Sequence, residues 1–260
     1  MVKSKDFEWK HYKPEIILWS VRWYCRYAIS YRDLKEMMEE RGLEITHTTP
    51  CRWVQQHAPE IDKRTRPYLK QSNDSYRVDE TYIKIKSKWK YLYRAVDSAG
   101  DTLEFLLTSK RDKKAAKRFF KKMLGNNHAI ELRVISVDKN KAYPPAFDEL
   151  KAEGIIPKTT QFRQKKYLNN IVEQPHCFIK RLIKNNQWFQ YVNTAKNTIA
   201  GYEIMNMIRR GQVKLVKKGE VLAQKKFVES LFGTSTPSNK FFRMFDSSEC
   251  VKLDRFAIAD

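Results

Sequence analysis

Apolar residues recur at two different spacings along the chain, and the change comes near residue 76. Before it they recur every three or four positions, which predicts three helices over residues 14–27, 31–41 and 49–57. Ser30, followed three residues later by Asp33, suits a helix N-cap. The sequence therefore predicts a small all-helical head.

After residue 76, β-branched and aromatic residues alternate with polar ones, which predicts an antiparallel meander of three strands. Helices and strands are expected to alternate further along. The expected elements are strands 76–86, 88–97 and 102–109, helix 111–124, strand 131–138, helix 146–154, strand 155–160 and helix 169–184. This order predicts an α/β fold, a ribonuclease-H-like mixed sheet with flanking helices.

A basic, proline-containing stretch without a hydrophobic period separates the two patterns and is typical of a linker. We therefore predict a helical domain over residues 1–62, a linker over 63–75, a ribonuclease-H-like domain over 76–212 and a C-terminal tail over 213–260. The end of the tail, from about residue 233, matches no expected element.

The last two head helices, joined by a GLEITHT segment, are typical of a helix-turn-helix whose final helix enters a DNA major groove. Arg52, Gln55 and Gln56 would then contact the bases. The alternative is a plain three-helix unit with Trp19 and Trp23 in its core.

The chain carries 51 Lys and Arg residues against 30 Asp and Glu, a net charge of +21. Residues 1–62 are neutral, with ten of each kind, so the excess falls on residues 63–260. Such an excess predicts a polyanionic partner, with DNA as the first candidate, because basic side chains bound to phosphates release counterions. Two basic runs, residues 110–122 and 163–166, are expected to contact phosphates, with Lys165 and Lys166 in the second.

No apolar stretch is long enough to span a bilayer, so a membrane role is not expected.

Four cysteines and five histidines are scattered without zinc-site spacing, and no apolar signal segment follows Met1. We therefore expect a reduced cytoplasmic protein without structural zinc.

Three acidic residues are distinguished by their places in the expected elements. Asp79 lies in the middle of an apolar strand, where an unpaired carboxylate is costly. Asp138 ends the apolar strand LRVISVD, and Glu173 lies in the first turns of the long helix, with thirty-four residues between them. Converging carboxylates of this kind can hold two divalent cations that support phosphoryl transfer. In the alternative, Asp138 caps the following helix and Glu173 serves the helix dipole. Asp97, expected in a turn, and Asp148, expected on an amphipathic helix, are the competing carboxylates.

Several long motifs resemble one bacterial family. They are EIILWSVRWYCRY and SYRDLKEMMEERG in the head, VDETYIKIKSKWKYLYRAVDSAGDTLEF around Asp79, VDKNKAYP around Asp138 and QFRQKKYLNNIVEQPHCFIKR around Glu173. In this order, over roughly residues 7–212, they are similar to the insertion-sequence-six family of transposases, which has a D…D-34-E spacing.

The resemblance implies that Asp79, Asp138 and Glu173 hold magnesium, or manganese in its place. It implies that Lys180, two turns beyond Glu173, contacts DNA near the cut, and Arg181 beside it is a further DNA-binding candidate. Such enzymes nick the 3′ ends of their element and join them to target DNA, which generates cointegrates. A homodimer or higher assembly on the terminal inverted repeats, in association with the bacterial nucleoid, is likewise implied.

The chain departs from the family pattern at Pro175, which stands inside the expected Glu173 helix where the family usually carries an acidic residue. This departure keeps an alternative open, a catalytically decayed DNA-binding protein derived from a transposase. A junction or RNA–DNA-hybrid nuclease with the same fold ranks last, because it has no need of the helical head.

Overall fold

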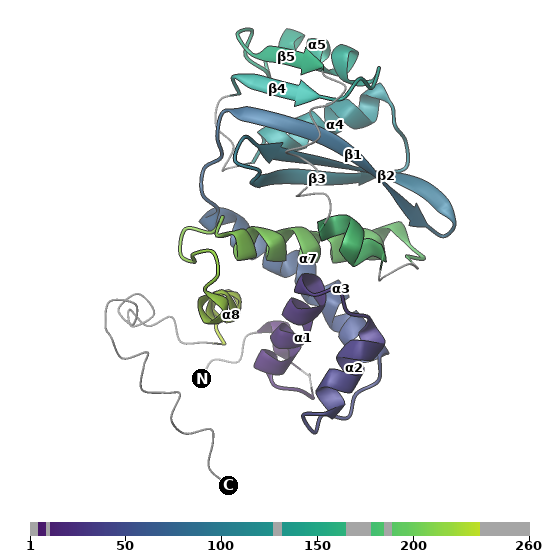
Figure 1. The fold of residues 1–260 in the computed structure, drawn as a ribbon, viewed down its shortest axis with the longest axis vertical. Coiled ribbons are helices and arrows are strands. Elements are labelled where there is room, and N and C mark those ends of the chain that lie inside the picture. The colour runs from purple at the N-terminus through teal and green to yellow at the C-terminus, as the bar shows by residue number, and fades with distance from the viewer. Residues whose placement is uncertain (1–4, 9–10, 127–131, 165–177, 185–188, 235–260) are drawn as a thin grey trace.

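The computed structural model describes residues 5–8, 11–126, 132–164, 178–184 and 189–234. At its centre is a five-stranded mixed sheet in the order β3-β2-β1-β4-β5 (Figure 1). The strands are β1 (Ser75–Ile85), β2 (Lys88–Asp97), β3 (Thr102–Thr108), β4 (Val134–Val137) and β5 (Gln161–Gln164). The first three form the predicted antiparallel meander, and β4 and β5 add in parallel beside β1. The sheet confirms the predicted ribonuclease-H-like fold.

The predicted strand over residues 155–160 is wrong in position, because its first two residues, Ile155 and Ile156, form the turn that closes the preceding helix. Helix α5 (Tyr143–Ala152) is followed by Gly154, which has a φ of 71°. The backbone N–H groups of Ile155 and Ile156 both donate to the carbonyl oxygen of Leu150, and Ile156 is buried. This is the usual close of a helix at a left-handed glycine, with an apolar contact after it. The strand β5 therefore begins only at Gln161.

Helices cover both faces of the sheet. On one face, α4 (Lys113–Leu124) and α5 bury aromatic side chains against Tyr76, Val78 and Tyr93. On the other face lies α7 (Val192–Arg210), together with the helical residues 178–184 (Figure 1). Since side chains alternate along a strand, neighbouring residues of β1 serve opposite faces.

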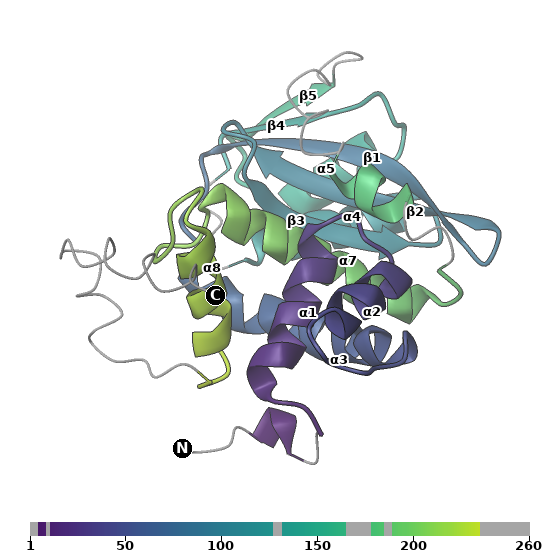
Figure 2. The same cartoon turned by 60° about the horizontal axis from the view of Figure 1, so that its bottom comes forward.

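The head consists of α1 (Pro14–Arg26), α2 (Tyr31–Glu39) and α3 (Thr48–Thr65), with a short 3₁₀ turn (Lys5–Phe7) before them. Figures 1 and 2 place these helices on the side of α7 away from the sheet. The predicted N-cap of α2 is confirmed, because the Ser30 hydroxyl accepts from Asp33 N while Asp33 accepts from Ser30 N. A further helix, α8 (Val221–Ser230), packs on α1 and α7 and places part of the predicted tail in the same core.

The third head helix is longer than predicted. It runs past residue 62, where the sequence suggested a boundary, and a 3₁₀ turn (Arg66–Tyr68) follows it. Ala58, Ile61 and Thr65 are buried, so the apolar stripe of the helix continues into the expected linker. Helices α1 and α3 pack closely on α7 at Gly201. A Cβ added at Gly201 would lie 2.8 Å from Ala58 Cβ and 2.5 Å from Cys25 Sγ, so a larger residue would not fit there. The separation into two domains stays a prediction.

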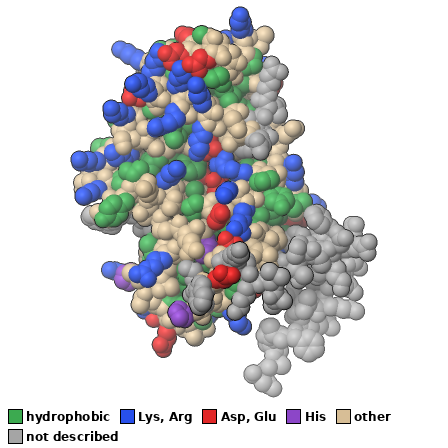
Figure 3. Space-filling view, turned by 180° about the vertical axis from the view of Figure 1, so that it is seen from behind, with side chains coloured by type: hydrophobic (Ala, Val, Ile, Leu, Met, Phe, Trp, Pro, Cys, Tyr) green, Lys and Arg blue, Asp and Glu red, His purple; other side chains and the backbone are tan. Residues whose placement is uncertain are grey.

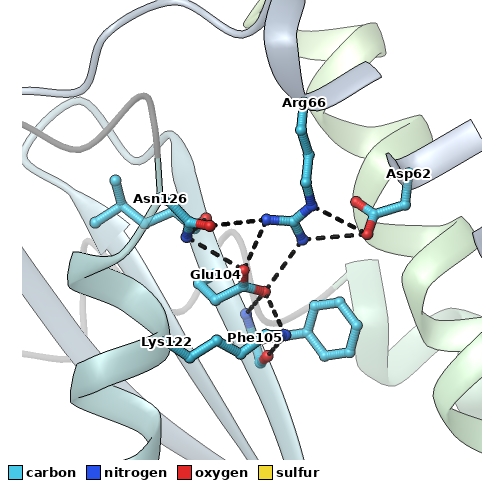
Figure 4. Close-up of polar contacts among 7 residues, drawn as sticks. Asp62, Arg66, Glu104, Phe105, Lys122 and Asn126 are labelled. Carbon is cyan, nitrogen blue, oxygen red and sulfur yellow. Dashed lines mark hydrogen bonds and ion pairs between the residues drawn. The ribbon is translucent and has the colours of Figure 1, made fainter. Parts of the chain in front are cut away.

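Ion pairs tie the end of α3 to the sheet (Figure 4). The Arg66 guanidinium donates to Glu104 of β3 at 2.8 Å and to Asp62 of α3 at 3.1 Å, and Lys122 of α4 donates to Glu104 at 2.9 Å. Burial would raise the pKa of Glu104, but the charges of Lys122 and Arg66 outweigh it and lower the pKa. The head and the sheet are thus joined by paired charges as well as by the apolar core.

Among the described residues, no helix has the length and apolar character needed to cross a membrane.

Candidate active site

Asp79 lies on β1, and Asp138 directly follows β4, the parallel neighbour of β1. The register of β1 and β4 pairs Ser75 with Val134 and Arg77 with Ser136. Continued by two residues, the same register sets Asp79 opposite Asp138. Burial raises the pKa of Asp79, and the negative charge of Asp138 raises it further, while the hydrogen bond from Glu80 N and the charge of Lys180 oppose the rise. The sheet therefore holds two of the three predicted carboxylates together.

These two carboxylates fit the ligand chemistry of a hard divalent cation. Both supply oxygen atoms, and burial is also the main cause that raises the pKa of Asp138. A bound cation would offset the cost of holding two negative charges in one half-buried place. Within the described residues, no group of three or more His, Cys, Asp and Glu side chains could hold a metal. Glu173, the third predicted ligand, lies outside the described residues, as does Pro175.

Glu80, a carboxylate that the sequence did not single out, supports Asp138 from the face of β1 opposite to Asp79. Glu80 has only 2% of its side chain exposed, pairs with Arg111, and accepts from the Asn140 amide at 2.6 Å. Arg111 Nη2 also lies 3.6 Å from Asp138 Oδ2, and Asn140 N donates to Asp138 Oδ1 at 3.1 Å. Glu80 thus binds the side chains of Arg111 and Asn140, the two residues that contact the Asp138 carboxylate within the described part of the chain.

Lys180, whose charge lowers the pKa of Asp79, lines a groove. The groove has a volume of about 590 Å³ and lies between the β1–β2 hairpin and the helical residues 178–184. Its described lining contains four lysines and no carboxylate, and the residues Tyr82 and Trp89 are 51% and 59% exposed. The full lining is Thr81, Tyr82, Ile83, Lys84, Lys86, Ser87, Trp89, Lys180, Ile183, Lys184, Phe189 and Gln190. The alternating lysines of IKIKSKWK were the only sign of this groove in the sequence.

Comparison with known proteins gives the same assignment as the motifs. A family model described as "DDE domain" matches residues 73–212. The chain is 38% identical over 197 residues to the transposase for insertion sequence-like element IS431mec of Staphylococcus aureus (strain Mu50 / ATCC 700699), which covers 76% of this chain and 85% of the relative. The transposase for insertion sequence element IS257 in transposon Tn4003, also of Staphylococcus aureus, matches with the same identity and coverage. The chain belongs to the insertion-sequence-six family of DDE transposases.

Solved structures similar to this transposase include the catalytic core domain of HTLV-2 integrase in complex with magnesium in its dimeric form, with a TM-score of 0.38 and 18% identity over 54% of this chain and 88% of that chain. The catalytic core domain of BIV integrase matches with a TM-score of 0.36 and 11% identity, over 49% of this chain and 80% of that chain.

Much of the basic run at residues 110–122 of the transposase is already neutralised within the chain. Lys113 and Lys117 pair with Glu149 of α5 at 2.6 and 2.9 Å, and Lys121 pairs with Glu153 at 2.9 Å. Lys122 pairs with the buried Glu104. These lysines hold α4 to its neighbours, which goes against the expectation that the run mainly contacts phosphates. Lys and Arg side chains are nonetheless spread widely over the face seen in Figure 3.

The predicted DNA-reading residues of the head differ in their surroundings. Arg52 and Gln56 lie exposed, one turn apart on α3. The amide of Gln55 instead donates to Thr198 Oγ1 of α7 at 2.9 Å, so the structure uses this side chain for packing and not as a free probe. Of the other predicted DNA contacts, Arg181 is exposed, and Lys165 and Lys166 lie outside the described residues.

Proposed function

We propose that this transposase cleaves the 3′ ends of its insertion sequence and joins them to target DNA, with Asp79, Asp138 and Glu173 as ligands of magnesium, or of manganese in its place. The observation that carries the proposal is the parallel pairing of β1 with β4, which ends two residues before Asp79 and Asp138, together with the charge of Asp138 that raises the pKa of Asp79. These carboxylates would hold a metal pair, whose charge would help to activate the attacking oxygen and to neutralise the leaving 3′-oxygen. Glu80, Arg111 and Asn140 hold the Asp138 carboxylate in place.

The Lys180 groove supplies the path for the DNA strand. Its lysines, Lys180 foremost, neutralise backbone phosphates, and the exposed residues Tyr82 and Trp89 offer rings on which an unpaired base can stack. In the head, Arg52 and Gln56 are exposed on α3 and would contact the terminal inverted repeat. A homodimer or larger assembly, cointegrate products and association with the bacterial nucleoid complete the proposal.

Strand transfer tests the proposal directly. A labelled duplex with the element end is incubated with plasmid and magnesium, and the native chain is compared with the Asp138→Asn variant. We expect joined product from the native chain and none from the variant, whereas Asp148→Asn, which removes an exposed carboxylate of α5, keeps the native rate. If the native chain binds the duplex without cutting or joining it, the protein is a decayed DNA-binding derivative and Pro175 is the first residue to revert.

The Glu80→Gln variant tests the support of Asp138. Because Glu80 orients Arg111 and Asn140, we expect its loss to lower activity or metal affinity roughly 10- to 100-fold, as for other groups that orient metal ligands. A titration of strand transfer against magnesium separates the two effects and should show a raised half-saturating concentration. Glu149→Gln, which removes an exposed carboxylate of α5, is the matched control, and an equal effect of both variants would refute the positioning role.

A further inference from the structure

Three arginines from three separate helical segments surround a second, smaller pocket. They are Arg26 of α1, Arg181 of the helical residues 178–184 and Arg209 of α7. The pocket has a volume of about 350 Å³, and Tyr27 and Ala28 complete the lining that the structure describes, which contains no carboxylate. A narrow recess of about 10 Å³ lies between the same helices, with the same arginines on its walls. Such a concentration of one charge is costly unless an anion enters.

Within the described residues, the arginines of this pocket have few compensating partners. Burial lowers the pKa of Arg209, and the charges of Arg26, Arg181 and Arg210 lower it further. Arg26 Nη1 donates to Gln224 at 2.9 Å, but its buried Nε has no hydrogen-bond partner among the described residues. The Arg26 guanidinium also lies 5.3 Å from the Tyr27 ring centre, a contact that cancels no charge.

A buried amide in the narrow recess also lacks part of its hydrogen bonding. Asn206 lines that recess and is 5% exposed. Its Oδ1 accepts from Arg209 Nη2 at 3.1 Å, whereas its Nδ2 has no partner among the described residues. A buried donor without an acceptor is costly in a folded protein. The recess has room for about one water molecule, so a phosphate would lie in the outer pocket, where Arg26, Arg181 and Arg209 present their guanidinium donors.

The helical residues 178–184 separate this arginine pocket from the Lys180 groove. Lys180, Ile183 and Lys184 line the groove, whereas Phe178, Arg181 and Leu182 line the recess. Residues three and four positions apart share a helix face, so the two sets lie on opposite faces. Adjacent residues of one helix, Lys180 and Arg181, thus serve two different basic sites.

We propose that the arginine pocket binds a backbone phosphate of DNA at a point apart from the catalytic groove. The inference rests on the proposed function to the extent that the DNA is the substrate of this transposase. Arginine suits the task because its planar guanidinium can present two donors to one phosphate. Since Arg26 belongs to the head and Arg181 to the catalytic side, a phosphate held between them would fix the head relative to the bound DNA.

DNA binding without divalent cations tests the pocket independently of catalysis. Anisotropy of a labelled random-sequence duplex is measured over a range of salt for the full chain and for Arg181→Gln, Arg209→Gln and the double variant. We expect each single variant to lower the salt slope by about one, and affinity at 0.1 M salt to fall roughly 10-fold. Lys121→Gln, which removes the same charge from a surface ion pair on α4, is the matched control.

Thermal unfolding separates a phosphate site from a structural role. Because the arginines repel each other, the double variant should melt at the same or a higher temperature than the native chain without DNA, whereas a structural role would lower the melting temperature. Inorganic phosphate at constant ionic strength should stabilise the native chain more than the double variant. Stabilisation by phosphate with an unchanged DNA salt slope would indicate a site for free phosphate and overturn the proposal. Unchanged DNA binding with an altered oligomeric state in light scattering would assign the pocket to an acidic protein segment and overturn it too.

Discussion

Replacement of Glu203 with glutamine is expected to lower the free energy of unfolding by about 3–5 kcal/mol. Glu203 of α7 pairs with Arg94 of β2, and the two side chains are 1% and 0% exposed. A second bond joins Arg94 Nη2 to Glu203 Oε2 at 2.9 Å. Glutamine keeps the size of the side chain but removes the charge, so the Arg94 guanidinium stays buried without its carboxylate. Urea unfolding followed by tryptophan fluorescence measures the change.

Two further variants separate the buried charge from the loss of the pair itself. The double variant Arg94→Met/Glu203→Leu replaces both charges with apolar groups and is expected to unfold with nearly the native free energy, or a higher one. Glu149→Gln removes a carboxylate that is 41% exposed and should change the free energy of unfolding far less, because solvent screens an exposed ion pair. A Glu203→Gln cost as small as that of Glu149→Gln would show that the pair contributes little to holding the sheet on α7.

The meander could be predicted from the sequence because its signals are local. Alternating residues bring β1 and β2 together at Lys86 and Ser87, and Asp97 accepts from Ala99 N and Asp101 N in the SAGD turn. A period of two residues and a short turn carry this information within about twenty positions. Asp97 ends β2, and its side chain holds the turn that follows, which fits the expected turn role and not a place in the active site.

Helix α7 could not be predicted in the same way. Twelve of its nineteen residues are buried, because the sheet covers one side and the head the other. A helix that is buried on several sides has no single apolar stripe, so the usual helical pattern is absent. The same packing engages Gln55, whose amide binds Thr198 of α7, and no local feature of α3 indicates this contact.

The residues of the candidate site likewise fall into those with a local signal in the sequence and those without one. Asp79 and Asp138 were recognisable because each is placed in or at the end of an apolar strand, where a charge requires a reason. Glu80 and Arg111 were not, since they come together only when β1 meets the segment before α4. The lysines of α4 likewise read as a free basic face until α5 supplies Glu149 and Glu153 as partners.

The Asp79→Asn variant is expected to lose strand transfer by a factor of at least about 10³, because a metal ligand supports several kcal/mol of transition-state stabilisation. Without metal, the Asp79→Asn variant should be more stable at neutral pH than the native chain. Burial and the charge of Asp138 raise the pKa of Asp79 in the folded state above its unfolded value. The stability linked to this carboxyl group is therefore fully present below the unfolded pKa and is lost as the pH rises through the folded pKa. Asparagine carries no charge and escapes this loss.

Melting temperatures with and without magnesium measure metal binding and the change in stability together. Magnesium should raise the melting temperature of the native chain, because a ligand that binds only the folded state stabilises it, and should raise that of Asp79→Asn far less. Without magnesium, the variant should melt above the native chain at neutral pH and match it at acidic pH, where Asp79 is protonated. Asp148→Asn is the control and should follow the native chain under each condition. An Asp79→Asn protein that still joins DNA ends, or that gains as much stability from magnesium as the native chain does, would show that Asp79 does not bind the metal.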